Sequence, residues 1–301
     1  MHVTFFSFCM AIGWSSLLII LVYFFRKKYL AIRFYSIWGL IQLYLFCAIR
    51  ILFPVELPFS KVIASRNMYT RIYRFIRSSF TVGNNIFSLG RIIVYIMLFI
   101  SLYLLCRFFY QYYKSMKEIK NYDMRLESNL QDILSEIIKE KKARIRPTIL
   151  ICSSINTPMS FGVLNKYILL PDKEYKKQEA YYILLHEYTH LANGDLLVKM
   201  LIHILCSVYW WNPFVYLLQR DLEQILEIKC DLAITKDINN EKKADYLETI
   251  LSSIKEVRDK EGNWKKEEGI ITGSVNFFQE TSIGVKERFR IVSQYRCKGS
   301  A

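Results

Sequence analysis

The sequence predicts an α-helical membrane protein that continues into a mainly helical α+β domain with a small β-sheet. The chain of 301 residues is 52% hydrophobic and 15% aromatic, yet it carries a formal net charge of +14. One compact soluble globule does not accommodate both excesses, so we expect them to be segregated along the chain. Only 11 Gly and 6 Pro are present, which excludes collagen-like and linker-dominated chains, and the apolar content excludes disorder.

The first domain, residues 1–113, is expected to contain three transmembrane helices, at about 5–25, 34–53 and 86–106. The first of these runs has 21 consecutive residues without a charge, which is long enough to cross a bilayer as a helix. Basic residues follow the run and do not precede it, which argues against a cleaved signal peptide.

Basic residues in the short loops predict the orientation. Arg26, Lys27, Lys28 and Arg33 lie between the first two spans and indicate a cytoplasmic loop. The N-terminus is then outside the cell, and the second domain, residues 114–301, is cytoplasmic.

The second domain begins with polar, amphipathic sequence. A helix is expected to start at Ser128 or Asn129 and to end before Pro147. Short strands are expected at 148–152 and 167–170, with a turn-rich stretch between them.

The helix after Asp172 contains the motif His186-Glu187-Tyr188-Thr189-His190. Residues four apart share a helix face, so both imidazoles can bind one metal. Two histidines and a carboxylate suit zinc, which leaves the fourth position open to water. Glu187 is placed to act as general base toward that water, whose pKa the metal lowers toward ~7.

A third ligand is expected from the segment LEQILEIKCDLA. This segment places Glu223, Glu227 and Asp231 on one face of a long helix, and its spacing leaves the choice among them open. A second carboxylate would orient a ligand histidine through its other ring nitrogen. His203 lies in an apolar run and is expected to be a packed core residue.

The chain resembles the BlaR/MecR family of membrane-bound zinc metallopeptidases, the antibiotic-sensing signal transducers of Gram-positive bacteria. The segments that carry the resemblance are TPMSFGVLNKYILLP, HEYTHLANGD, YWWNPFVYLLQRDLE, EIKCD and KERFRIV.

The resemblance implies an HExxH-type (zincin) metalloprotease domain with one zinc ion bound by His186, His190 and Glu227. Glu223 is held as the reserve ligand. Asp231 and Asp195 are expected to contact the ligand residues without binding the metal themselves.

Residues 196–209 are apolar, but we do not expect them to cross the membrane. The run is only about 14 residues long, which is too short for a span. In addition, His190 and Glu227 must meet on one metal and therefore lie on the same side of the membrane. A re-entrant or membrane-apposed helical hairpin over about 195–236, turning at Asn212-Pro213, satisfies both conditions. An edge strand beside the zinc helix could hold an extended substrate by main-chain pairing.

By resemblance, the substrate would be a BlaI/MecI-like transcriptional repressor or the chain itself, with self-cleavage expected in 258–284.

The basic residues flank apolar spans, so membrane lipid is the expected counter-charge and no direct nucleic-acid contact is expected. A dimer is one option for the oligomeric state, which the residues leave open. No further apolar run precedes Ala301, so we expect no β-lactam-binding sensor domain here.

Two alternatives accompany this hypothesis. One is a quality-control protease similar to the Ste24/HtpX type, which shares the HExxH logic without the Trp-Asn-Pro turn. The other is a non-catalytic membrane receptor or scaffold, which the presence of Glu187 disfavours because a scaffold needs no general base.

Overall fold

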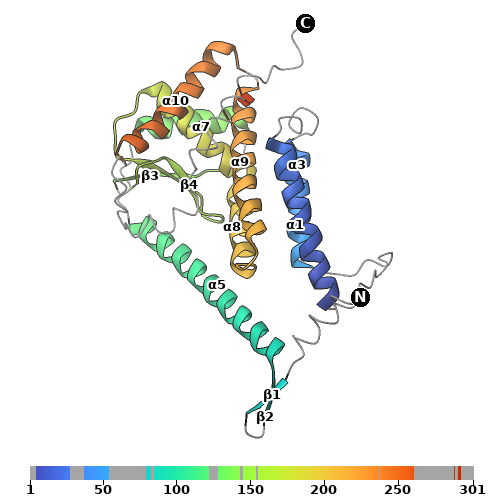
Figure 1. The fold of residues 1–301 in the computed structure, drawn as a ribbon. Helices are drawn as coiled ribbons and strands as arrows, with labels where there is room; N and C mark the ends of the chain where they lie inside the picture. Colours follow the sequence, from blue (N-terminus) through green and yellow to red (C-terminus); the bar gives the residue numbers. More distant parts are fainter. Residues whose placement is uncertain are drawn as a thin grey trace. The chain divides into compact units, whose positions relative to one another are not determined.

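The computed structural model describes residues 5–27, 37–53, 79–82, 85–121, 128–142, 145–153, 155–236, 238–260, 288 and 291–292. These residues are mainly helical with a small three-stranded sheet, which confirms the predicted fold class (Figure 1). The chain divides into two compact units. The first comprises Met1–Phe109 with Ile204–Leu218, and the second comprises Tyr110–His203 with Gln219–Ala301.

The first unit contains helices from the part of the chain where membrane spans are predicted. Helix α1 (Phe5–Lys27) packs against α3 (Ile37–Leu52), and the two run side by side in Figure 1. A two-stranded hairpin, β1 (Ser79–Val82) and β2 (Asn85–Ser88), precedes the long helix α5 (Leu89–Asn121).

Two of these helices are long and apolar enough to cross a bilayer, over Phe8–Arg26 and Leu89–Ile119, which marks the chain as a membrane protein. Helix α3 is apolar, but its 16 residues fall below that length. The third expected span starts later than predicted, because residues 86–88 belong to β2. It also ends later, because good helix formers such as Lys117 and Glu118 extend the helix beyond the apolar run.

Helices α8 (Asp195–Val208) and α9 (Pro213–Thr235) form a hairpin whose turn belongs to the first unit. Asn212 caps α9, since its side-chain oxygen accepts a hydrogen bond from the Phe214 N–H at 3.0 Å. Pro213 fits the first helical position, where an N–H would have no partner within the helix. The predicted turn at Asn212-Pro213 is therefore where the chain reverses.

The second unit is built on a sheet with strand order β3-β5-β4. Strands β3 (Thr148–Cys152) and β5 (Tyr167–Pro171) pair in parallel, and β4 (Met159–Phe161) pairs antiparallel with β5. The β4 strand lies inside the stretch expected to be turn-rich. Gly162 follows it with φ +90°, and a Cβ there would lie 1.9 Å from the Asn165 carbonyl oxygen, so only glycine fits this tight return.

Alternate residues of the strands face opposite sides of the sheet. Ile149, Ile168 and Leu170 join the core formed with α6 (Ser128–Lys141), α7 (Lys177–Asn193) and α10 (Asn240–Lys260). Leu150 and Leu169 join a second cluster with Ile119 from the C-terminal end of α5. The sheet therefore has α7, the helix that carries the metal-binding motif, on one face.

Candidate metal centre

Helix α7 presents His186 and His190 on one face, as the spacing predicts. Both side chains are buried, and their rings meet edge to face with centroids 4.7 Å apart. The two Nε2 atoms are 3.2 Å apart.

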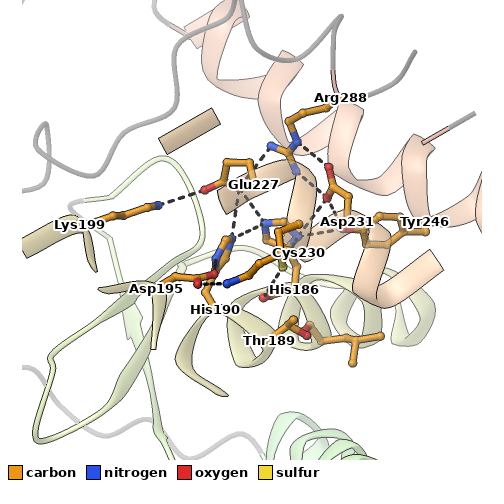
Figure 2. A network of polar contacts seen from close by, with 12 residues as sticks. His186, Thr189, His190, Asp195, Lys199, Glu227, Cys230, Asp231, Tyr246 and Arg288 are labelled. Carbon is orange, nitrogen blue, oxygen red and sulfur yellow. Dashed lines mark hydrogen bonds and ion pairs between the residues drawn. The ribbon is translucent and has the colours of Figure 1, made fainter. Parts of the chain in front are cut away.

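Helix α9 adds Glu227 to this pair (Figure 2). Its Oε2 atom lies 3.2 Å from His190 Nε2 and 3.4 Å from His186 Nε2. Tetrahedral zinc with ligand bonds of about 2.0–2.2 Å separates its donors by roughly 3.3–3.6 Å. The three donor atoms therefore fit a single zinc ion, and they fit it through Nε2, Nε2 and one carboxylate oxygen.

Asp195 lies behind His190. Gly194 ends α7 with φ +71°, a left-handed conformation, and donates its N–H to the His190 carbonyl. The chain bends by 63° between α7 and α8 at this point, and Asp195 Oδ2 lies 2.9 Å from His190 Nδ1. Lys229 Nζ donates to the other Asp195 oxygen at 2.5 Å.

Two residues connected by a hydrogen bond, Tyr246 and Asp231, hold the Nδ1 side of His186. The Tyr246 hydroxyl lies 2.9 Å from His186 Nδ1 and donates to Asp231 Oδ1 at 2.6 Å. Since the hydroxyl proton is directed to Asp231, the hydroxyl oxygen accepts from His186 Nδ1–H. Asp195 is likewise an acceptor for His190 Nδ1–H, so both rings keep their Nε2 lone pairs for a metal.

Two further charged residues touch Glu227. Lys199 of α8 donates to Oε1 at 3.1 Å, and Arg288 Nη1 lies 3.5 Å from Oε2. Burial by itself would raise the pKa of Glu227. Without a metal, the protonated form of His190 and the Lys199 ammonium outweigh burial and hold that pKa well below its usual range. Glu227 is therefore a carboxylate, the form a metal requires.

Glu187 is buried and follows His186 directly in the sequence. Burial disfavours the charged form of Lys199, yet Glu227, Glu223 and Glu187 together raise its pKa. Lys199 therefore remains a cation among the carboxylates.

Two further residues near the centre, the reserve ligand Glu223 and Cys230, have other contacts. Glu223 accepts a hydrogen bond from Gln219 at 3.1 Å and lies 3.8 Å from His203, which is buried. Cys230 has its donor atom near those of His186 and His190, but its Sγ contacts His186 at Nδ1 (3.6 Å) and at the carbonyl (3.5 Å). Cys230 therefore faces the ring nitrogen that Tyr246 also contacts, and Glu227 is the better third donor.

Sequence reasoning missed four residues of this centre, which are Lys199, Lys229, Tyr246 and Arg288. A lone charge in an apolar run, such as Lys199 in 196–209, is a signal that a buried partner exists. Lys229 and Arg288 lie within the quoted segments EIKCD and KERFRIV. Tyr246 has no comparable signal, because tyrosine is common in helices that pack on a core.

The chain matches the protein family described as BlaR1 peptidase M56 over residues 9–269. It is 36% identical to the regulatory protein BlaR1 of Bacillus licheniformis over 106 residues, which are 34% of this chain and 18% of that protein. It is 29% identical to the methicillin resistance mecR1 protein of Staphylococcus aureus over 170 residues, 53% of this chain and 28% of that protein.

A third relative, the regulatory protein BlaR1 of Staphylococcus aureus, is 25% identical over 142 residues, 46% of this chain and 24% of that protein. The chain thus covers less than a third of the length of each of these relatives. The family match extends over most of the chain and includes every residue of the metal centre except Arg288. The chain belongs to the BlaR1 peptidase M56 family.

Proposed function

We propose that this chain is an integral-membrane zinc endopeptidase. The observation that carries the proposal is the convergence of His186 Nε2, His190 Nε2 and Glu227 Oε2 at 3.2–3.4 Å from one another, with Glu187 adjacent. Family membership supports the same reaction class. A binding scaffold would need neither the donor set nor the neighbouring carboxylate.

Each residue has a distinct role in the proposed reaction. His186, His190 and Glu227 would hold one zinc ion, which would supply Lewis-acid polarisation of the scissile carbonyl and of the attacking water. Glu187 accepts a proton from the water and returns it to the leaving amine, so it serves first as base and then as acid.

The residues behind the ligands fix the ring tautomers. Asp195 accepts from His190 Nδ1–H, and Tyr246 with Asp231 holds His186 Nδ1–H. Such outer partners raise the basicity of the ring and prevent it from rotating.

An extended peptide is the substrate form that the sheet favours. Strand β4 is an edge of the three-stranded sheet and packs against α7. Its outer edge offers main-chain groups for pairing with a substrate strand. Such pairing would hold the scissile bond straight beside Glu187.

We place the site at the cytoplasmic face of the membrane. The basic residues after α1 favour an internal loop there, and hence an external N-terminus. Membrane lipid is the partner we propose for the basic residues that flank α1 and α5.

A protein with a regulatory role is the substrate we favour, either a BlaI/MecI-like repressor or the chain itself. Relatives named for regulation and for methicillin resistance support this choice over general degradation. Most of the stretch 258–284, where we expect self-cleavage, lies outside the described residues.

Glu187→Gln tests the proposal. The amide is nearly isosteric but is not a base, so zinc should remain while the cleavage rate falls by about 10²–10⁴-fold. The full chain in detergent micelles would be incubated with zinc and either a purified BlaI-type repressor or β-casein, and the products identified by mass spectrometry. Glu179→Gln, a substitution on the same helix in a pair with Lys173, is the matched control and should retain activity.

The outcomes separate the alternatives. One cut in the repressor with little casein loss supports signalling, whereas many cuts in casein support quality control. A Glu187→Gln protein that cleaves as fast as the unaltered chain contradicts the proposed mechanism.

A further inference from the structure

Arg288 reaches the metal centre from a segment far along the chain. It lies 57 residues after Asp231, yet its side chain is only 3% exposed among the groups behind the ligands. Arg288 Nε donates to Asp231 Oδ2 at 2.7 Å, and Nη2 donates to Oδ1 at 2.8 Å. Figure 2 shows the guanidinium between Asp231 and Glu227.

The paired contact fixes the plane of the Asp231 carboxylate. Two parallel N–H···O bonds define both the position and the rotation of a carboxylate, which a single ammonium group cannot do. Asp231 Oδ1 also accepts from Tyr246, whose oxygen contacts His186 Nδ1. A rotation of Asp231 would therefore move the acceptor that holds His186.

The same guanidinium also faces a proposed ligand directly. Arg288 Nη1 lies 3.5 Å from Glu227 Oε2, while Lys199 binds Oε1 at 3.1 Å. If Arg288 only stabilised the fold, its ion pair with Asp231 would be sufficient. The additional approach to Glu227 connects Arg288 with ligands on both α7 and α9.

We infer that Arg288 is a positioning residue of the metal centre, acting on His186 through Asp231 and Tyr246 and on Glu227 by direct contact. The inference rests on the proposed zinc site. It makes metal binding depend on residues near the C-terminal end of the chain, beyond the matched family region.

The test measures metal affinity without any substrate. Zinc dissociation constants of the full chain in detergent would be obtained by competition with a chromogenic chelator, and Co²⁺ absorption spectra would report coordination geometry. Arg288→Ala should weaken zinc binding by about 10–100-fold and alter the Co²⁺ bands. Arg288→Lys should give an intermediate loss, because it restores charge without the paired contact. Arg220→Ala, at an exposed arginine of α9, is the matched control.

A double-mutant cycle separates the relay from a general loss of packing. Tyr246→Phe removes the hydroxyl between His186 and Asp231 and should also weaken zinc binding. If both residues act through Asp231, the double variant should lose far less affinity than the product of the single losses. Multiplicative losses, or an Arg288→Ala protein with unaltered affinity and Co²⁺ spectrum, would overturn the inference.

Different results would contradict the proposed function and the role of Arg288. If the unaltered chain binds no zinc, the metal site itself is wrong. If it binds zinc and cleaves while Arg288→Ala and Arg288→Lys bind equally well, only the role of Arg288 is wrong. Should Arg288→Ala fail to fold, Arg288→Lys carries the same comparison.

Discussion

Three carboxylates around the two histidines each have a basic partner, and this pairing explains how these charges are buried. Asp195 pairs with Lys229, Asp231 with Arg288, and Glu227 with Lys199. Isolated buried charges are costly, whereas paired and hydrogen-bonded ones are tolerated. The pairs therefore hold the centre in shape before a metal binds.

Asp195→Asn tests the pair behind His190. The amide oxygen can still accept from Nδ1–H, but it is neutral and leaves Lys229 without this carboxylate. We expect zinc affinity to fall by about 10–100-fold and the zinc-free protein to lose about 3–5 kcal/mol of stability. Chelator competition and thermal unfolding measure the two effects.

A second substitution separates these effects. Adding Lys229→Met removes the cation that contacts Asp195, so the stability should recover while the zinc affinity should not. Asp132→Asn, on the exposed face of α6, is the control. Unaltered zinc affinity in Asp195→Asn would show that Asp195 does not act on His190.

At the scale of elements, the turn of the α8–α9 hairpin contacts α1, α3 and α5. Tyr209 donates to the Ile51 carbonyl at 2.7 Å, and Asn212 donates to Ser16 at 3.3 Å. Ser101 of α5 donates to the Val208 carbonyl at 2.9 Å. Ser16 is ten residues from Arg26, the end of the apolar segment, which is about 15 Å along a helix. This supports the prediction that the hairpin is re-entrant or membrane-apposed.

Tryptophan fluorescence tests the depth of the turn. A variant with Trp14, Trp38 and Trp264 changed to Phe keeps only Trp210 and Trp211. Lipids brominated at mid-chain should quench this variant strongly and aqueous iodide weakly. A variant that keeps only Trp264, which we expect in the cytoplasm, should show the reverse. Strong iodide quenching of Trp210 and Trp211, without quenching by lipid, would place the hairpin outside the bilayer.

At the scale of the whole molecule, the long apolar segments and the cluster of polar groups belong to different parts of the chain. Helices α1 and α5 contain apolar segments long enough to cross a membrane, and the cluster of polar groups lies in the second unit. Periodicity and motif spacing predict such elements because they depend on local sequence. Neither predicted that α5 continues to Asn121 or that β4 is a strand.

The site was predictable only in part. His186 and His190 follow from their spacing on one helix, and Glu227 was chosen by resemblance. The positions of Tyr246 and Arg288 depend on contacts with residues far away in the sequence, which no local pattern encodes. Their contacts with His186 and Asp231 join positions 60 and 57 residues apart.

Zinc content of the purified full chain tests the central claim most directly. Elemental analysis should find about one zinc per chain in the unaltered protein and in Glu223→Gln, because Glu223 lies against Gln219 and His203 and is not one of the proposed ligands. Glu227→Gln should lose most of its zinc, since an amide oxygen is a poor substitute for a carboxylate ligand. Full zinc content in Glu227→Gln, together with its loss in Glu223→Gln or Cys230→Ser, would contradict the assigned ligand set.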